Sequence, residues 1–107
     1  MMQGHTHRNY QNPVDGTPEG GIALAPGIKI SWQNGPLGRD EDRKEPNGAF
    51  VETVIAIAKE RLEFYQSTRF ASPYNARAIT ALEDALASLN ARTQEREVRE
   101  VEGTHVE

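Results

Sequence analysis

The 107-residue sequence contains no cysteine. Disulfide frameworks and thiolate metal sites are therefore excluded, and the composition suits a reducing compartment. Long apolar runs are missing as well, since none reaches the roughly 18 residues that a membrane-spanning helix needs, and the first residues lack the pattern of a secretory signal peptide. We therefore expect an intracellular protein that does not cross a membrane.

Apolar and aromatic side chains are scarce. Hydrophobic residues make up 36% of the chain and aromatic residues 7%. A chain of this length has room for one domain, and so small a share of apolar residues leaves that domain a thin core. Burying apolar surface against a second copy would supply the stabilisation that a thin core lacks. The composition therefore predicts a homo-oligomer.

Positive charge is also in short supply. The chain has 12 Lys and Arg against 16 Asp and Glu, which gives a formal net charge of -4. Polymeric nucleic acid is bound through massed Lys and Arg that displace counterions from the phosphates, so this balance argues against a general nucleic-acid binder. A small anion held by a few well-placed arginines remains compatible with it.

Known catalytic motifs are missing too. The sequence has no P-loop, no glycine pattern of dinucleotide-binding folds, no H-E-x-x-H zinc motif and no G-x-S-x-G nucleophile motif. The carboxylates lie in polar segments, which indicates a solvated surface rather than acids with a raised pKa. His5 and His7 lie in a polar N-terminal segment with no third ligand nearby. We predict no catalytic residue, no metal site and no cofactor.

The residues that are present predict a small β element followed by two long helices. Residues 1–19 are polar and rich in turn signals, and two short apolar runs then flank Pro26-Gly27, which is typical of a β-hairpin. In chain order, the expected elements are a flexible arm over 1–19, a β-hairpin over 21–33, a loop over 34–47, helices over 48–68 and 72–97, and a C-terminal tail over 98–107, with 20–107 as a single domain.

Both helices are predicted from their start residues and from apolar residues at three- and four-residue spacing. Asn47 can cap the first helix, and Ser72 followed by Pro73 is a strong start for the second. The apolar stripes comprise Val51, Val54, Ile55, Ala58, Leu62 and Tyr65 in the first helix, and Tyr74, Ala78, Ile79, Leu82, Ala85, Leu86 and Leu89 in the second. The short connection makes the helices antiparallel. The predicted class is α+β, mainly α, with subunits joined through the helices.

Several residues are suited to binding a small anion or a nucleotide. Gly35 and Gly38, followed by Arg39, would bring backbone N–H groups and a guanidinium to a phosphate, although most such clusters are only turns, and a turn is the favoured interpretation. Asn75 and Arg92 would hydrogen-bond a ligand, with helix capping and pairing to Glu as the alternatives. Aromatic rings stack on purines, although core packing is the commoner role of a single ring. The aromatic candidates are Trp32, Phe64, Tyr65, Phe70 and Tyr74.

Three blocks of the sequence resemble a known family. They are G-G-I-A-L…I-S-W-Q-N-G-P-L-G-R over 20–39, E-P-N-G-A-F-V-E-T-V-I over 45–55 with R-L-E-F-Y-Q over 61–66, and R-T-Q-E-R-E-V-R-E-V-E-G-T-H over 92–105. In these blocks the chain is similar to the Thoeris anti-defence one family of phage nucleotide sponges. The family fold, a small N-terminal β element followed by a long antiparallel helical pair, agrees with the elements expected above.

The resemblance implies a non-enzymatic protein that acts in the cytoplasm of the host bacterium. Family members bind and sequester the glycocyclic ADP-ribose signals that TIR-domain proteins make in Thoeris immunity, so that the effector is not activated. They assemble through dimers into hexamers, and some also hold cyclic oligonucleotides of the CBASS system in separate pockets. The related anti-CBASS two proteins share the helical hairpin. The expected partners are therefore cyclic ADP-ribose isomers and further copies of the chain, with cyclic di- or trinucleotides as the alternative principal ligand.

Carried over position by position, the resemblance implies a ligand site with stacking rings and anion-binding arginines. Trp32 and either Phe64 or Tyr65 would stack on the ligand. Arg39 and Arg92 would hold its pyrophosphate. The choice between Phe64 and Tyr65 depends on the helical register and stays open in the sequence.

Polar groups complete the site that the resemblance implies. Asn75 would hydrogen-bond the ligand as a donor or as an acceptor. Thr104 and His105 would close a pocket from a neighbouring subunit. The alternative from another class is a structural or adaptor protein of the phage, whose helical hairpin serves only for assembly.

Overall fold

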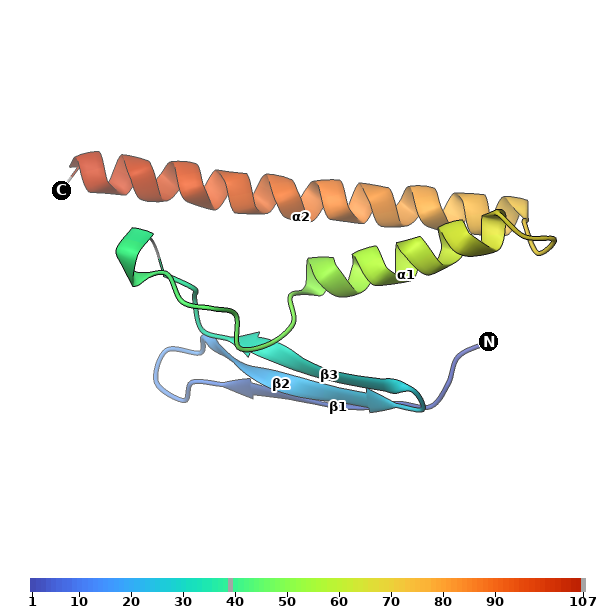
Figure 1. Ribbon diagram of the computed structural model, residues 1–107. Helices are drawn as coiled ribbons and strands as arrows, with labels where there is room; N and C mark the ends of the chain where they lie inside the picture. Colours follow the sequence, from blue (N-terminus) through green and yellow to red (C-terminus); the bar gives the residue numbers. More distant parts are fainter. Residues whose placement is uncertain (39, 107) are drawn as a thin grey trace. The chain divides into compact units, whose positions relative to one another are not determined.

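The computed structural model describes residues 1–38 and 40–106, with side chains over 1–38 and 41–98. The elements are β1 (Thr6–Gln11), β2 (Pro18–Ala25), β3 (Ile28–Asn34), the 3-10 turn η1 (Asp40–Asp42), α1 (Val51–Gln66) and α2 (Pro73–Val106) (Figure 1). They fall into two compact units, of which the first is Met1–Val51 and the second begins at Glu52. The predicted class, α+β with helix in the majority, is confirmed.

The first unit is a three-stranded antiparallel sheet with the strand order β1-β2-β3. β2 and β3 form the predicted hairpin around Pro26-Gly27, and Ala25 pairs with Ile28 directly across the turn. Gly27 has a φ of 77°, in the left-handed region that residues with a side chain rarely adopt. The hairpin begins at Pro18, three residues before its expected start at 21, because β2 continues towards its pairing with β1.

The prediction of a flexible arm is wrong over Thr6–Gln11, because these residues form β1 and pair with β2. Polar side chains build the turn between these strands. Asn12 Oδ1 accepts a hydrogen bond from Val14 N at 2.8 Å, and Asp15 Oδ1 accepts one from Thr17 Oγ1 at 2.7 Å. Such side-chain turns reverse the chain without burying an apolar residue. Every residue of β1 is exposed, so the apolar alternation that identifies a strand is missing from its sequence.

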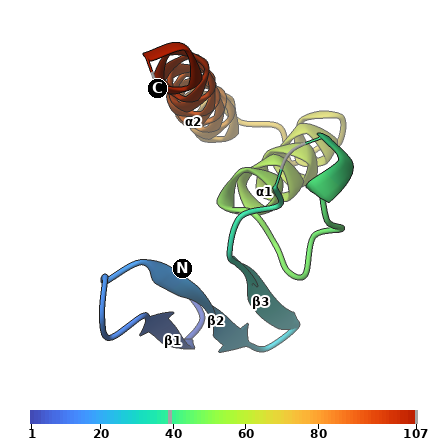
Figure 2. The same ribbon diagram turned by 90° about the vertical axis from the view of Figure 1, so that its left-hand side faces the viewer.

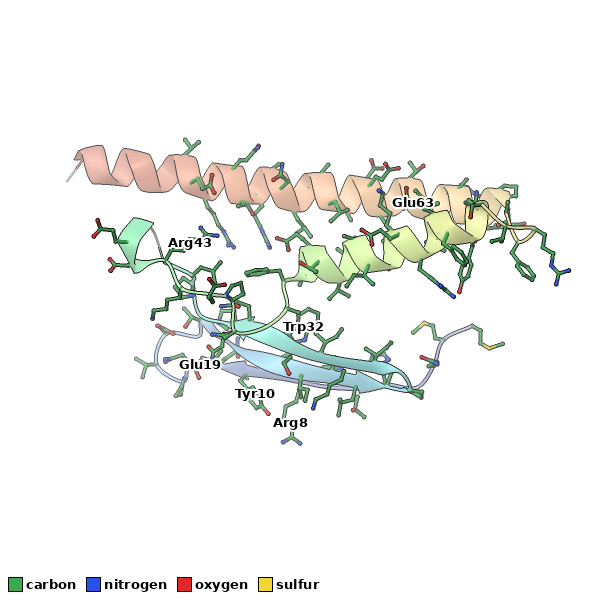
Figure 3. All side chains as sticks on the ribbon, viewed as in Figure 1. Arg8, Tyr10, Glu19, Trp32, Arg43 and Glu63 are labelled. Carbon is green, nitrogen blue, oxygen red and sulfur yellow. The ribbon has the colours of Figure 1, made fainter. Side chains whose placement is uncertain are left out.

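β1 nevertheless shows the side-chain geometry of a strand. Arg8 and Tyr10 project to the same side of the sheet in Figure 3, as residues two apart on a strand do. The register shifts between Asn9 and Gln11, so this edge strand carries a bulge.

The segment that leads into α1 closes the outer edge of β3. Gln33 N donates a hydrogen bond to Ala49 O at 3.0 Å, and Ala49 N donates one to Ser31 O at 2.7 Å. Gly48 passes so close that a Cβ there would lie 2.6 Å from the carbonyl carbon and oxygen of Trp32. The backbone of this segment therefore acts as a short additional edge of the sheet.

Asn47 belongs to this closure rather than to the helix. Its Oδ1 accepts from Asn34 N and its Nδ2 donates to Asn34 O, both at 2.8 Å. The side chain is therefore not available as a helix cap, and both the predicted cap and the predicted helix start at 48 are wrong. α1 begins at Val51 instead.

The two helices run in opposite directions from the turn at 67–72, as predicted (Figures 1 and 2). α1 ends at Gln66 rather than 68, because Ser67 and Thr68 donate both N–H and hydroxyl hydrogen bonds back to the last turn of the helix. The predicted start of α2 is confirmed. Ser72 Oγ accepts a hydrogen bond from Asn75 N at 3.1 Å, and Pro73 is the first helical residue.

α2 continues beyond its expected end at 97 and reaches Val106. The prediction of a C-terminal tail is therefore wrong over 98–106. The stretch after Leu89 is rich in Arg, Gln and Glu, which are strong helix formers. The single Gly103 costs about 1 kcal/mol relative to Ala, which does not by itself end a helix. Over the described residues, neither helix combines the length and the apolar character that a membrane-crossing helix requires.

Apolar burial is shallow throughout: none of the described side chains is fully buried. The half-buried apolar residues of the helices are Val54, Ile55, Ala56, Leu62 and Tyr65 on α1 and Ala78, Ile79, Leu82, Ala85, Leu86 and Leu89 on α2. The predicted stripes are therefore confirmed except at Val51, Ala58 and Tyr74, which are exposed; Val51 and Tyr74 lie in the first turns of their helices.

Candidate functional site

The end of α1 carries a cation–π cluster that is open to solvent. The Arg61 guanidinium lies 4.9 Å from the ring centroid of Phe64 and 4.9 Å from that of Tyr65. The two ring centroids are 6.0 Å apart and the rings are tilted by 51°. This arrangement follows from the helix, in which residues three and four apart are neighbours. Phe64 is 52% exposed and Tyr65 is half-buried, so Phe64 offers the more accessible ring.

Two more arginine–aromatic pairs follow on the turn and on the first turn of α2. The Arg69 guanidinium lies 5.1 Å from the Phe70 ring centroid, and that of Arg77 lies 4.7 Å from the Tyr74 ring centroid. Phe70 is 65% exposed and Tyr74 is 75% exposed. Flat rings left this open suit stacking on a ligand with a π face.

The charge of this region is opposite to that of the chain as a whole. Residues 61–77 contain three arginines and one acid, Glu63, whose Oε1 lies 3.4 Å from Lys59 Nζ. Within the described part of the chain, the three arginines have no carboxylate partner. Their N–H groups are therefore available to an anion, and planar guanidinium groups match the geometry of phosphate oxygens.

Asn75 ties the start of α2 to the end of α1. Its Nδ2 donates to Gln66 Oε1 at 3.2 Å and to the Phe70 carbonyl oxygen at 3.1 Å. Gln66 in turn bonds both backbone groups of Ser72, accepting from Ser72 N at 2.8 Å and donating to Ser72 O at 3.1 Å. Asn75 is half-buried, and its hydrogen bonds hold the turn between the two helices.

The structure brings together only part of the predicted site. Phe64, Tyr65 and Asn75 lie at the same end of the helical pair. Arg92 is exposed on α2, and at 1.5 Å per helical residue its Cα lies about 25 Å from that of Asn75. A ligand of nucleotide size does not reach both residues within one chain.

The remaining predicted residues lie elsewhere. Trp32 is half-buried in the first unit, where it pairs with Gly21 across the sheet. Arg39 lies outside the described residues. Thr104 and His105 lie within the span of α2, but their side chains are outside the described ones. Their predicted contacts with a ligand stay predictions.

The glycines before Arg39 have a structural explanation. Gly35 and Gly38 have φ values of 80° and 83°, and a Cβ at Gly38 would lie 2.7 Å from Asp42 O. Lys44 N donates to Leu37 O at 2.7 Å and closes the loop. Gly38 is thus required by the turn itself, and anion binding by this loop stays a prediction.

His5 and His7 form a ring pair near the start of β1. Their ring centroids are 6.1 Å apart and the rings are tilted by 31°. Among the residues that the structure describes, no group of three or more His, Cys, Asp or Glu side chains comes together to hold a metal ion.

Four residues of the candidate site were not predicted as such: Arg61, Gln66, Arg69 and Arg77. The spacing of Arg61 to Phe64 and of Tyr74 to Arg77 on helices was the signal available for two of them. The bond from Gln66 to Asn75 spans the turn and depends on how the two helices meet, so nothing in the sequence pattern indicates it.

The chain is similar to known proteins over most of its length. Residues 24–94 match the family model described as Acb2/Tad1, hairpin domain. The chain belongs to the Acb2/Tad1 hairpin domain family. Thoeris anti-defense 1 of Bacillus phage SBSphiJ7 is 45% identical to it over 76 residues, which cover 71% of this chain and 51% of the relative. The chain therefore spans about half the length of that curated relative, and the resemblance to the Thoeris anti-defence one family is confirmed.

The hairpin-domain match defines which predicted site residues the family relationship covers. It begins near the end of β2 and ends within α2, so it includes Trp32, Phe64, Tyr65, Asn75 and Arg92. β1 and the last part of α2 lie outside it. The helical turn with its arginine–aromatic pairs is thus central to the hairpin domain.

Proposed function

We propose that this chain is a phage anti-defence sponge that binds glycocyclic ADP-ribose signals made by TIR-domain proteins. It sequesters them unchanged in the cytoplasm of the host bacterium and so blocks Thoeris immunity. The observation that carries the proposal is membership of the Acb2/Tad1 hairpin domain family, together with 45% identity to a protein named Thoeris anti-defense 1. The exposed rings and unpaired guanidinium groups of the turn support it, because they match a purine and a pyrophosphate.

The complete site requires a second copy of the chain. Asn75 lies three residues before Ala78 and Arg92 three residues after Leu89, so they flank the half-buried stripe of α2 symmetrically and continue its face. If two α2 helices pack antiparallel about the middle of this stripe, Asn75 lies opposite Arg92 of the partner subunit. The pairing also buries apolar side chains that one chain leaves half-exposed.

The expected hexamer would need a further interface between such dimers. Ile57 and Phe64 are 61% and 52% exposed on α1, on a face separate from its half-buried stripe. We propose this face, with Arg61 beside it, as the surface that joins dimers. Trp32, Arg39, Thr104 and His105 would reach a pocket only in that assembly.

Ligand capture tests the function directly. The purified protein is mixed with glycocyclic ADP-ribose, separated by size, and denatured to release what it holds. The expected result is depletion of the free nucleotide and its recovery intact. Recovery of a hydrolysed product would show an enzyme and overturn the sponge proposal. A competition titration with cyclic di- and trinucleotides identifies the principal ligand.

Thermal unfolding separates a sponge from an adaptor protein. A ligand at one hundred times its dissociation constant stabilises the protein that binds it by about 2.7 kcal/mol. Cyclic ADP-ribose isomers should therefore raise the melting temperature clearly. An adaptor whose helices serve only assembly would show no such rise with any cyclic nucleotide.

A further inference from the structure

The sheet has one closed edge and one open edge. The backbone of Ala49 hydrogen-bonds Ser31 and Gln33 and so covers the outer edge of β3. At the other edge, β1 pairs with β2 alone among the described residues, and each of its side chains is exposed. The unpaired N–H and C=O groups along such an edge form a template on which a further strand can pair.

The backbone groups at the open edge include those of His5 and His7. The Arg8 carbonyl oxygen faces β2, because it lies 2.5 Å from the position that a Cβ at Gly21 would occupy. Successive residues of a strand direct their backbone groups to opposite edges. The N–H and C=O groups of His7, and those of His5 two residues earlier, therefore face away from β2.

The two histidine side chains share one face of the sheet. Their ring centroids are 6.1 Å apart and the rings are tilted by 31°. On the neighbouring strand, His7 faces Ala23, and the same register places Ala25 opposite His5, so both cross-strand neighbours are small. Arg8 projects from the opposite face, because side chains alternate along a strand. The space beside the two imidazoles is therefore open, and the guanidinium is kept away from it.

Two imidazoles at this spacing make up half of a tetrahedral zinc site. Zinc binds histidine nitrogen at about 2.0 Å, so two rings on one tetrahedral ion have centroids about 5 Å apart. The observed 6.1 Å reaches that value by a movement of about 1 Å, which rotation of exposed side chains allows. A structural zinc site needs four ligands, and no group of three or more His, Cys, Asp or Glu comes together among the described residues of one chain. The missing ligands must come from a second molecule.

A second copy supplies them through the open edge. In an antiparallel β1–β1 pair centred on Thr6, His5 lies opposite His7 of the partner subunit, and His7 lies opposite His5 of the partner subunit. This register pairs backbone groups that face the open edge in both copies and brings four imidazoles to one face. Arg8 then lies opposite Gly4 of the partner subunit, so the two guanidinium groups do not oppose each other. The bulge of β1 lies beyond the paired residues.

We propose that His5 and His7 of two copies bind one zinc ion and so join two sheet units edge to edge. Both residues lie outside the family match over 24–94, so the inference depends neither on the family relationship nor on the proposed function. It also explains why the sequence predicts no metal site, because one chain holds only half of the ligands. Zinc would link copies through their sheets, separately from the helix faces proposed above.

Sedimentation velocity of the full chain, with zinc chloride or with EDTA, tests the assembly. Zinc should at least double the mass of the sedimenting species, EDTA should reverse the change, and titration calorimetry should give half a zinc ion per chain. His5→Ala and His7→Ala should each lose the response, with circular dichroism unchanged. Thr6→Ala is the matched control, because its side chain lies on the opposite face, and it should keep the response.

A single cysteine tests the register of the two strands. The natural sequence contains no cysteine. Thr6 would lie opposite Thr6 of the partner subunit at a non-hydrogen-bonded position, where Cα atoms are about 4.5 Å apart, within the range that a disulfide spans. Thr6→Cys should therefore cross-link at least tenfold faster with zinc than with EDTA. Val14→Cys, at a residue that is 93% exposed in the β1–β2 turn, should show no acceleration by zinc.

Three outcomes would overturn the proposal. One zinc ion per chain, with no change in mass, would assign the metal to a site within one chain. A zinc response retained by both His5→Ala and His7→Ala would assign it to other ligands. Equal acceleration at Thr6→Cys and Val14→Cys would refute edge pairing in this register. None of these measurements involves a nucleotide, so their failure would leave the proposed function untouched.

Discussion

The sheet unit and the helical pair are stabilised in different ways. In the sheet unit, the decisive contacts are made by the backbone and by short polar side chains: Asn12 and Asp15 build one turn, and Asn47 joins the edge of β3 to the segment before α1. In the helical pair, the decisive features are a half-buried apolar stripe and arginine–aromatic pairs, which one chain leaves partly unused.

This contrast separates contacts that one chain completes from surfaces that we propose a second copy and a ligand cover. Strand pairing satisfies the facing backbone groups of β1, β2 and β3 within one chain. Half-exposed leucines and unpaired guanidinium groups instead represent binding capacity that a second copy and an anion would use. Substitutions in the sheet unit should therefore alter the stability of a single chain, and substitutions on the helices should alter association and ligand binding.

The largest expected effect comes from placing a charge in the apolar stripe. Leu82→Asp puts a carboxylate into the face where we propose that two α2 helices pack. We expect the dissociation constant of the dimer to rise at least hundredfold, about 3 kcal/mol, because the buried methyl groups are lost and an unpaired charge would be desolvated. Sedimentation velocity over a concentration series measures the change. Ala81→Asp, at an exposed position one residue away, is the matched control.

A steric change in the sheet unit should be the next largest. Gly48→Ala places a Cβ 2.6 Å from the carbonyl carbon and oxygen of Trp32, so the closing segment must move away from β3. We expect a loss of about 2 kcal/mol, typical of overpacking against rigid structure. Trp32 fluorescence should report the change with far-UV helical signal retained. Gly4→Ala, where no atom lies within 4 Å, should have no effect, and an equal effect at both positions would contradict the explanation.

A smaller effect is expected at the start of α2. Ser72→Ala removes the Oγ that accepts from Asn75 N, and losing such a cap costs about 1 kcal/mol. Hydrogen exchange of the Asn75 amide should accelerate several-fold, which mass spectrometry of the peptide containing it can detect. Ser88→Ala, at an exposed position within the same helix, is the control and should leave that exchange unchanged.

The same contrast determines what the sequence predicts. The two helices, their turn and the β2–β3 hairpin were predicted because apolar periodicity and strong turn signals mark them. β1 was missed because none of its side chains is buried, so the strand exists through pairing alone. Asn47 was misassigned because a residue that suits a helix cap equally suits a sheet contact, and the fold decides between them.

Local spacing and family resemblance predict some residues of the candidate site, and their role in ligand binding stays a prediction. Phe64, Tyr65 and Asn75 lie at the same end of the helical pair. The distance between Asn75 and Arg92 along one helix means that one ligand could meet both residues only across two copies, the arrangement that we propose, and no single-chain pattern contains it. The hydrogen bonds that orient Asn75 likewise depend on the meeting of two helix ends.

The smallest expected effect is the loss of local stability in the β1–β2 turn when the pH is lowered. Hydrogen bonds from the Thr17 backbone N and, secondly, from its hydroxyl lower the pKa of the exposed Asp15 carboxyl below its ordinary value of 3.8. A carboxyl with a lower pKa in the folded state stabilises the fold above its unfolded pKa, and this contribution disappears as the pH falls through the folded value.

NMR titration should show the lowered pKa of Asp15, and Thr17→Val should raise that pKa part of the way by removing only the hydroxyl bond. An unchanged pKa in that variant would assign the whole shift to the backbone bond. Because the group is solvated, the acid sensitivity should remain confined to this turn, with the helical pair unaffected over the same range.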